Sequence, residues 1–439
     1  MTRSERPGSG YDAQEIQRAP NTWGWDMLDD MAGMRTGERI QAFRERKGLS
    51  RPVLAGLVGM SPSWLKGIER GSRLPPRLPM LVKLAEALGT SDVAVLAGTD
   101  LDLGGSTSIP VDSFGRIPHD ALPAIREAVR APLLRTPTGT VDIAALASRT
   151  AQAWRVWHHS SQHRTDVGRI LPRLITDARI AVRTTEGGDR RRANAVLTDI
   201  YALAQHEVVW ASEAELVWIV ADRAMAAAQD ADTPMALASA AWTLGMVQRT
   251  TGDTDAAIGL VNDAADLLAP ALPEGGDEVR AMYGALRLHA ATTAARAGRE
   301  GDAWRYWDAA DGIAARLDAR YHHPWTMFGA SNVELHAVSI SIDLSKSADA
   351  RSRAEGIDPE SIPSRERRGR LGVEIARSYH QRRDYPAMLH WLEYAYRTAN
   401  DSVRYSPTAR QMAADALTHG GALISHRARS LAGSIGLGF

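Results

Sequence analysis

The sequence predicts an all-α protein in two parts, and three observations support this fold class. Residues 49 to 71 carry the start and stop signals of two short helices joined by a glycine turn. From about residue 119 to the end, apolar residues recur almost without a break at helical spacing. Within this longer part, small residues recur at intervals that fit pairs of packed helices. We therefore expect a small helical domain followed by a series of helical hairpins.

The composition excludes several classes of protein. The 439 residues are 24% charged and 44% hydrophobic, which is ordinary for a water-soluble protein with a sizeable core. The longest apolar runs, such as residues 216 to 221, are too short to span a bilayer, and the first residues lack the apolar core of a signal peptide. Without cysteine, the chain has no disulfide, catalytic thiol or cysteine-bound zinc. We expect a cytoplasmic protein that does not contact membranes.

Residues 1–34 are rich in glycine, proline and polar side chains, so we expect a flexible N-terminal arm. Trp23, Trp25 and Met27 are its large apolar groups, and docking on the chain itself is favoured over docking on a partner.

The stretch from Leu49 to Gly71 predicts a helix-turn-helix. Ser50 and Ser61 are each followed by a proline in the first helical turn, and a serine oxygen caps the free N–H groups there. Gly59 lies between the two signals and permits a left-handed turn. We expect one apolar face on the first helix, formed by Leu54, Leu57 and Val58.

The segment around this motif is basic although the whole chain is neutral. Between Arg35 and Gly98, eleven basic residues accompany five acidic ones, a net charge of +6. A local basic surface is typical of a module that binds phosphates, whereas a solvated basic face without a partner is the alternative.

Five short helices are expected between Thr36 and about Ala97, and their sequence resembles the XRE-type helix-turn-helix family of bacterial and phage repressors. The family pattern "R..KG.S…LA…G.S…L..IERG.R.P" is present almost in full over roughly 60 residues. The resemblance implies a double-stranded DNA operator as partner of residues 35–98. It also implies that Arg44 and Glu69 tie the first and third helices together.

The same resemblance assigns the DNA-contacting residues. Arg51 matches a helix-start position that contacts phosphate, and Pro62, Ser63, Lys66 and Gly67 match exposed positions of the recognition helix. Because proline and glycine offer no side-chain hydrogen bond, base readout is left to Ser63, Lys66 and Arg70, with Trp64 either packed in the domain or in contact with DNA. The expected DNA-binding set is Arg51, Ser61, Pro62, Ser63, Trp64, Lys66, Gly67, Arg70, Arg73 and Arg77.

Residues 99–118 are rich in glycine, serine and proline without helical periodicity and are expected to link two domains. Helices are expected next at about 119 to 131 and 141 to 163, at the start of a helical domain that spans residues 119–439.

Residues 240 to 270 have the layout of a tetratricopeptide repeat, with Leu244-Gly245 on a first helix, Gly252 in the turn and Ala257 on a second. Similar layouts begin near residues 198, 238, 284, 331 and 369, which are 40, 46, 47 and 38 apart rather than the 34 of that repeat. We therefore expect a tetratricopeptide-like α-solenoid with longer loops, and a plain helical bundle is the alternative.

A solenoid offers an inner surface, and its polar residues are candidate ligand contacts. Arginines near an asparagine and an aromatic ring suit a peptide backbone or a carboxylate, although any solvated face carries such residues. The expected ligand-binding set is Asp199, His206, Trp242, Met246, Arg249, Thr292, Arg296, Asn332, Arg377, His380 and Gln381.

The order of the two domains resembles large actinobacterial regulators and, more distantly, the peptide-sensing regulators of Gram-positive bacteria. The resemblance implies a homodimeric transcriptional regulator that senses a peptide or small molecule. The alternative is a protein-interaction adaptor with a vestigial helix-turn-helix, supported by Pro62 and Gly67 at positions expected to read bases.

Catalytic and metal-binding patterns are not found in the sequence. His158, His159 and His163 have no further ligand at metal spacing, and no HExxH, GxSxG or dinucleotide motif is present. Trp154 and Trp157 are expected in the core. We expect no enzyme activity, no metal and no cofactor.

Overall fold

The structure is a computed structural model that describes residues 31, 33–73, 76, 78–88, 90, 93–98, 119–132, 134, 139–211 and 214–437. The chain divides into two compact units, Met1–Ser113 and Phe114–Phe439. The expected arm and linker lie almost wholly outside the described residues. Among those residues, no helix is both long and apolar enough to cross a bilayer.

The first unit contains four α-helices and a short 3₁₀ helix in its described part. These are α2 (Thr36–Arg46), α3 (Arg51–Leu57), α4 (Pro62–Glu69), α5 (Leu78–Leu88) and the 3₁₀ helix η1 (Val93–Leu96). The Ser50 hydroxyl accepts a hydrogen bond from Val53 N at 3.4 Å, and the Ser61 hydroxyl accepts one from Trp64 N at 3.1 Å. Gly59 has φ +72°, so both predicted caps and the left-handed turn are confirmed.

One prediction about α3 is wrong. Leu54, Ala55 and Val58 are buried, but the Leu57 side chain is 62% exposed. The buried set follows the helical spacing of 54, 55 and 58, and Leu57 is turned away from that arc because successive residues advance by about 100°. The fifth expected helix is the single 3₁₀ turn η1.

The second unit begins with three helices, α6 (Leu122–Arg130), α7 (Ile143–His159) and α8 (His163–Thr184). The expected single helix from 141 to 163 is therefore wrong at its end. Ser160 is extended, with ψ 140°, and its hydroxyl donates to Asp166 of the next helix at 2.6 Å. The backbone thus turns at Ser160, and His163 begins a different helix from His158 and His159.

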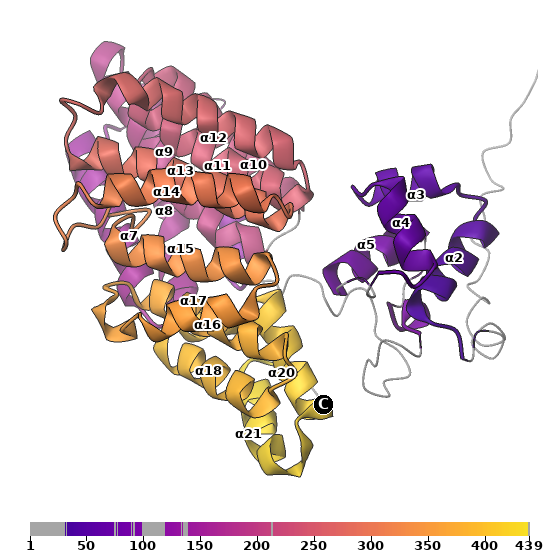
Figure 1. Cartoon of the computed structure of the whole chain (residues 1–439). Coiled ribbons are helices and arrows are strands. Elements are labelled where there is room, and N and C mark those ends of the chain that lie inside the picture. The colour runs from indigo at the N-terminus through magenta and orange to yellow at the C-terminus, as the bar shows by residue number, and fades with distance from the viewer. Residues whose placement is uncertain are drawn as a thin grey trace, which may run out of the picture. The chain divides into compact units, whose positions relative to one another are not determined.

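Five helical hairpins follow, and Figure 1 shows their helices from α9 to α18 in the second unit. In each hairpin a first helix packs against the second, and the first helices also contact one another in succession from α9 to α17. The pairs are α9 (Gly187–Ala211) with α10 (Ala214–Ala231), α11 (Pro234–Thr251) with α12 (Thr254–Leu268), α13 (Asp277–Arg296) with α14 (Glu300–Ala314), α15 (Ala330–Asp343) with α16 (Ser347–Glu355), and α17 (Arg365–His380) with α18 (Tyr385–Thr398). The short α19 (Asn400–Arg404) leads to a last pair, α20 (Pro407–His419) and α21 (Gly421–Ser434). The 3₁₀ turns η3 (Ala269–Ala271) and η4 (Pro359–Ser361) follow α12 and precede α17.

Small residues allow the hairpins to pack closely, as the sequence predicts. A Cβ on Gly245 would lie 2.9 Å from the Val261 side chain, and one on Gly284 would lie 2.0 Å from the Phe328 ring. Ala257, which sits on the second helix of the same hairpin as Gly245, is fully buried. The tetratricopeptide-like arrangement is therefore the fold of this unit.

Helices near the end of the second unit pack against helices near its beginning. α17 packs on α7, and α19 packs on α8. Asp401 of α19 accepts hydrogen bonds from Arg164 N and Thr165 N, each at 3.1 Å, and so satisfies free N–H groups in the first turn of α8. These contacts join segments more than 230 residues apart and fix the curvature of the series.

The connection between α14 and α15 packs into the interior. In this segment Phe328 is fully buried and Trp325 is 5% exposed. His158 of α7 joins it to the last hairpins, since its Nε2 donates to the Trp325 carbonyl at 3.0 Å and its Nδ1 accepts from the Ser364 hydroxyl at 3.1 Å. A long connection without a helical pattern therefore forms part of the core.

Candidate functional site

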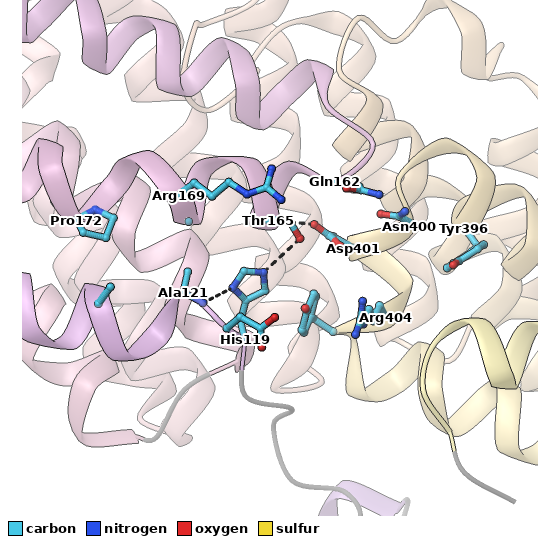
Figure 2. Close-up of a pocket in the computed structure, with 14 residues that line it drawn as sticks. His119, Ala121, Gln162, Thr165, Arg169, Pro172, Tyr396, Asn400, Asp401 and Arg404 are labelled. Atoms are coloured by element: carbon cyan, nitrogen blue, oxygen red, sulfur yellow. Dashed lines mark hydrogen bonds between the residues drawn. The ribbon is translucent and has the colours of Figure 1, made fainter.

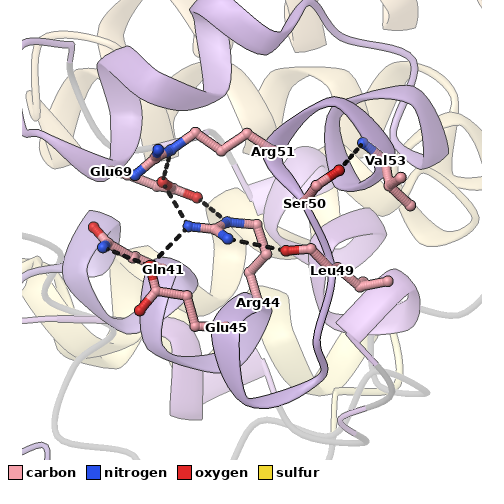
Figure 3. A network of polar contacts seen from close by, with 8 residues as sticks. All are labelled: Gln41, Arg44, Glu45, Leu49, Ser50, Arg51, Val53 and Glu69. Carbon is pink, nitrogen blue, oxygen red and sulfur yellow. Dashed lines mark hydrogen bonds and ion pairs between the residues drawn. The ribbon is translucent and has the colours of Figure 1, made fainter.

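A buried network of charges holds the helix-turn-helix together (Figure 3). Arg44 of α2 contacts Glu69 of α4 through Nε at 2.6 Å and through a terminal nitrogen at 3.1 Å. Their side chains are 6% and 0% exposed, so the predicted Arg44–Glu69 pair is confirmed as an internal tie. The Arg44 guanidinium also donates to the Leu49 carbonyl at 2.9 Å, just before α3. Three helical segments are thus fixed by one arginine.

Arg51 occupies a position between this network and solvent. Its Nε lies 2.5 Å from Glu69 Oε2, and its side chain is 35% exposed. The sequence did not reveal this ion pair, because Glu69 was expected to pair with Arg44 alone. One carboxylate therefore orients two guanidinium groups, one buried and one at the start of α3 where an anion would also meet free N–H groups.

Helix α4 carries half of the residues expected to contact DNA. Pro62, Ser63 and Lys66 are exposed, and Arg70 follows exposed at the end of the helix. Trp64 is half-buried, so it is partly packed in the domain and partly accessible. Ser61 is exposed, but its hydroxyl already caps the helix.

Gly67 is a correction, because it is buried rather than exposed. A Cβ at this position would lie 2.9 Å from the Arg73 side chain, and the Gly67 carbonyl accepts hydrogen bonds from Arg73 N at 3.1 Å and Ser72 Oγ at 3.2 Å. The segment after α4 folds back on this glycine, so its role is close packing. Arg73 is exposed above it, and Arg77 lies outside the described residues.

Helix α3, the first helix of the motif, exposes apolar groups that the sequence analysis did not expect at the surface. Val53 and Leu57 are 49% and 62% exposed and lie four residues apart on α3, outside the arc of the buried Leu54, Ala55 and Val58. Apolar side chains at a DNA surface contact thymine methyl groups. Leu57 follows the buried Leu54 by three residues, a spacing typical of one face, so sequence spacing alone did not separate Leu57 from the core.

In the second unit, the first helices of the hairpins share one face, which we call the inner stripe. It comprises Asp199 and His206 of α9, Trp242, Met246 and Arg249 of α11, His289, Thr292 and Arg296 of α13, Asn332, His336 and Asp343 of α15, and Glu366, Arg370 and Arg377 of α17. Residues on each helix are spaced by three, four, seven or eleven positions, so they lie on one side of it. Side chains bridge neighbouring helices along the stripe: the rings of His206 and Trp242, and those of Trp242 and His289, lie 5.3 and 5.6 Å apart.

The middle of the inner stripe is aromatic. The imidazole of His206 stacks on the half-buried indole of Trp242 with an interplanar angle of 0°. Trp325 packs against both, with ring centroids at 6.4 and 5.4 Å. Burial lowers the pKa of His206 to about 4, so this ring is neutral at pH 7. Trp154 and Trp157 lie beneath as core residues, as predicted.

One end of the stripe is rich in arginine. Asp343 accepts from Arg296 at 3.3 Å and from Arg377 at 2.8 Å, and Arg377 also contacts Glu374 at 2.6 Å. The structure therefore brings Arg296 and Arg377 together, as the sequence analysis expected, but through a carboxylate that it did not identify. Arg249 lies near them, since Arg296 and Arg370 add to burial in lowering the pKa of its guanidinium.

The remaining expected ligand residues have different surroundings. Met246 and Thr292 are 7% and 3% exposed, and Asn332 is 5% exposed, so these three shape the packing of the stripe. Asp199 remains accessible, but the surrounding protein excludes enough water, together with the nearby Glu278 carboxylate, to raise its pKa to about 7. His380 and Gln381 are engaged elsewhere: His380 Nε2 lies 2.6 Å from Asp415 of α20, and Gln381 donates to the Ile342 carbonyl at 3.2 Å.

A separate pocket of about 420 Å³ opens where α6, α8 and α19 meet (Figure 2). His119 forms its base, accepting from Ala121 N at 3.2 Å and donating to the Thr165 hydroxyl at 3.4 Å. Behind it lies Glu207, which is fully buried and 3.5 Å from His119 Nδ1. Burial raises the pKa of Glu207 to about 8 and lowers that of His119, so both groups are neutral at pH 7. Arg169 and Arg404 stand at the rim in Figure 2.

The histidines considered as metal ligands in the sequence do not converge. His158 is bonded inside the core, His163 packs edge-on against Trp157 with centroids 4.6 Å apart, and His159 donates to the Arg155 carbonyl at 2.8 Å. In the part of the chain that the structure describes, no three histidine, aspartate or glutamate side chains are placed to hold a metal ion together.

The chain was compared with known proteins and protein families. One similar solved structure is PlcR of Bacillus thuringiensis in complex with the peptide PapR7 and DNA, with 10% sequence identity, coverage of 82% of this chain and 98% of that chain, and a TM-score of 0.30. Another is ComR of S. thermophilus in complex with DNA and its signalling peptide ComS, with 16% sequence identity, coverage of 72% of this chain and 99% of that chain, and a TM-score of 0.18. No curated protein matches the sequence. Residues 35–97 match the family model of a helix-turn-helix domain. The region with the Glu69 network, α3 and α4 is therefore a helix-turn-helix domain.

Proposed function

We propose that the chain is a sequence-specific DNA-binding transcriptional regulator whose helical-repeat unit binds a signal that controls operator binding. The observation that carries the first half of this proposal is the surface of α4. Ser63, Lys66 and Arg70 are exposed on or just after a helix that Glu69 anchors to the rest of its domain. A rigid helix that presents donors and positive charge is what major-groove binding requires.

The surface is better supplied for phosphate contacts and shape recognition than for many base contacts. Pro62 is exposed without a side-chain donor, Gly67 is buried, and Val53 and Leu57 add apolar groups. In this proposal Lys66, Arg70 and Arg73 neutralise phosphates, while Ser63 and the apolar groups of α3 contact bases. One such domain spans a half-site, so the regulator acts as a homodimer on a two-fold operator.

The signal in this proposal binds at the inner stripe. Its arginine end and its aromatic centre are both accessible in part, and together they supply charge and apolar area for a peptide or a small molecule. The pocket at His119 is a second element of the mechanism. It is lined by His119 and by residues of α8, and its wall includes α19, which packs on α8. A shift of the last hairpins against α8 would therefore change the shape of this pocket.

Titration of the full chain with promoter DNA tests the proposal. We expect a preference of about 10³-fold over random duplex and a steep fall in affinity with salt. Lys66→Ala and Arg70→Ala should each weaken binding, and Arg305→Ala, an exposed arginine of α14, serves as the control that leaves it unchanged. Salt-sensitive binding with no preference for any sequence would instead support a protein-interaction adaptor with a vestigial helix-turn-helix.

A further inference from the structure

We propose that the inner stripe binds an oxyanion, a carboxylate or a phosphate, on a ligand with an apolar or aromatic body, and that Arg249 and Arg370 hold the oxyanion. This inference deepens the proposed signal-binding role and rests on it only for its biological consequence. Binding itself is a property of the second unit and is measured without DNA.

The charges at the arginine end do not balance. Five guanidinium groups, those of Arg249, Arg296, Arg367, Arg370 and Arg377, share three carboxylates, those of Asp343, Glu366 and Glu374. Asp343 and Glu374 are taken up by Arg296 and Arg377, and Glu366 lies 3.5 Å from Arg367. Two positive charges are left over, and the histidines nearby do not change this, because burial keeps His289 and His336 neutral.

Arg249 and Arg370 are the two arginines of this group that no carboxylate in the described part of the chain contacts directly. Among the described residues, neither side chain makes an ion pair or a hydrogen bond, and Arg249 Nε is buried without a partner. Both are half-buried rather than free in solvent. Arg370 lies one turn from Glu366 and from Glu374 on α17, yet it contacts neither. A half-buried guanidinium without a partner is costly, and an incoming oxyanion removes that cost.

The positive charges of Arg249 and Arg370 also affect the same neighbouring group. Arg370 and Arg296 both lower the pKa of Arg249, and Arg370 and Arg249 both lower the pKa of His336, which lies on α15 between α11 and α17 in sequence. Like charges are therefore gathered there from three helices. Guanidinium groups bind carboxylate and phosphate oxygens in pairs, which suits the planar forks of two arginines.

Helix α11, which carries Arg249, also supplies the contact for the apolar part of the ligand. Trp242 precedes Arg249 by seven residues on α11, a rise of about 10 Å. The half-buried Trp242 indole, stacked on neutral His206, offers an aromatic wall at that distance from the guanidinium. A ligand whose ring and acid group are separated by a few bonds reaches both.

Thermal unfolding of the full chain, titrated with small acids at constant ionic strength, tests this site. The probes are 4-phenylbutyrate, butyrate and phenyl phosphate, compared with chloride. We expect a saturable rise in the unfolding temperature of about 2 °C at tenfold excess over Kd, with 4-phenylbutyrate acting at roughly tenfold lower concentration than butyrate because its ring is buried. Saturation by 4-phenylbutyrate alone identifies a carboxylate site, and saturation by phenyl phosphate alone identifies a phosphate site.

Variants separate site binding from general salt effects. Arg249→Met and Arg370→Met should abolish the saturable rise, while Arg305→Met, which removes a solvent-exposed arginine of α14, should retain it. Because each site variant removes an unpaired charge, its unfolding temperature without probe should equal or exceed that of the wild type, and Arg249→Gln serves as a second variant at the same position. No saturable rise with either aromatic probe, or an equal rise in Arg249→Met, would overturn the inference. Probe binding that leaves the affinity for promoter DNA unchanged would overturn the signalling role and leave the oxyanion site standing.

Discussion

Replacing Glu69 by alanine tests the idea that one buried carboxylate organises the helix-turn-helix domain. The substitution leaves the Arg44 guanidinium, 6% exposed, with the Leu49 carbonyl and the exposed Glu45 as its remaining partners. Removing one member of a buried ion pair costs about 3 to 5 kcal/mol, because the other charge stays buried. A domain of this size is stable by roughly 3 to 9 kcal/mol, so the variant should be close to unfolded in this region. Arg51 loses the same partner but can turn to water.

Hydrogen exchange followed by mass spectrometry measures this locally. Amides of α2 and α4 should exchange about 10² to 10³ times faster in Glu69→Ala, while those of α11 and α13 should keep their wild-type rates. The double variant Arg44→Met/Glu69→Leu removes both charges and keeps the volume, and it should recover most of the protection. An acceleration below tenfold in the single variant, or a double variant as unprotected as the single one, would refute the reasoning.

Three further predictions concern the DNA surface, the core and the response to acid. Arg73→Ala should weaken binding to all DNA sequences alike and reduce the slope of log affinity against log salt by about one, measured by titration at several salt concentrations; a change confined to one sequence would mean a base contact. Gly284→Ala should destabilise the second unit by about 1 to 3 kcal/mol in denaturant unfolding, since its Cβ would lie 2.0 Å from the Phe328 ring, and Gly301→Ala on α14, where a Cβ meets open space, should not. The free energy of unfolding should fall as the pH drops below about 6.5 and continue to fall toward pH 4, because histidines take up protons in the unfolded chain but stay neutral in the folded core. Each buried histidine should lower the free energy of unfolding by about 2 kcal/mol at pH 5. Tryptophan fluorescence measured against pH checks this, and a core that is unchanged down to pH 4 would contradict it. The histidines concerned, with their folded pKa values, are His158 and His163 at about 3 and His206 and His323 at about 4.

The DNA-binding domain was largely predictable because its signals are local. Ser50, Ser61 and Gly59 act on the backbone within three or four residues, and they cap and turn the chain as expected. The Arg44–Glu69 pair followed from family resemblance and is present. Gly67 was misjudged because its burial depends on how the segment after α4 folds back, which no local pattern records.

The helical-repeat unit was predictable in its periodicity but not in its long-range closure. Small residues at fixed spacing indicated which helices pair, and inner positions such as Arg249, Arg296 and Arg377 lie on one shared stripe. The shared partner of Arg296 and Arg377 could not be predicted, since Asp343 comes from α15 and its pairing depends on side-chain geometry. The segment that carries Trp325 has no helical pattern, so its place in the core could only come from the structure.

Genome-wide footprinting of the full chain tests the central proposal of a DNA-binding regulator most directly. We expect a limited set of protected sites, each with two half-sites related by a two-fold axis, and loss of protection when Lys66 and Arg70 are replaced by alanine. Protection that is spread over the genome without a shared sequence, or that is unchanged in the double variant, would contradict it.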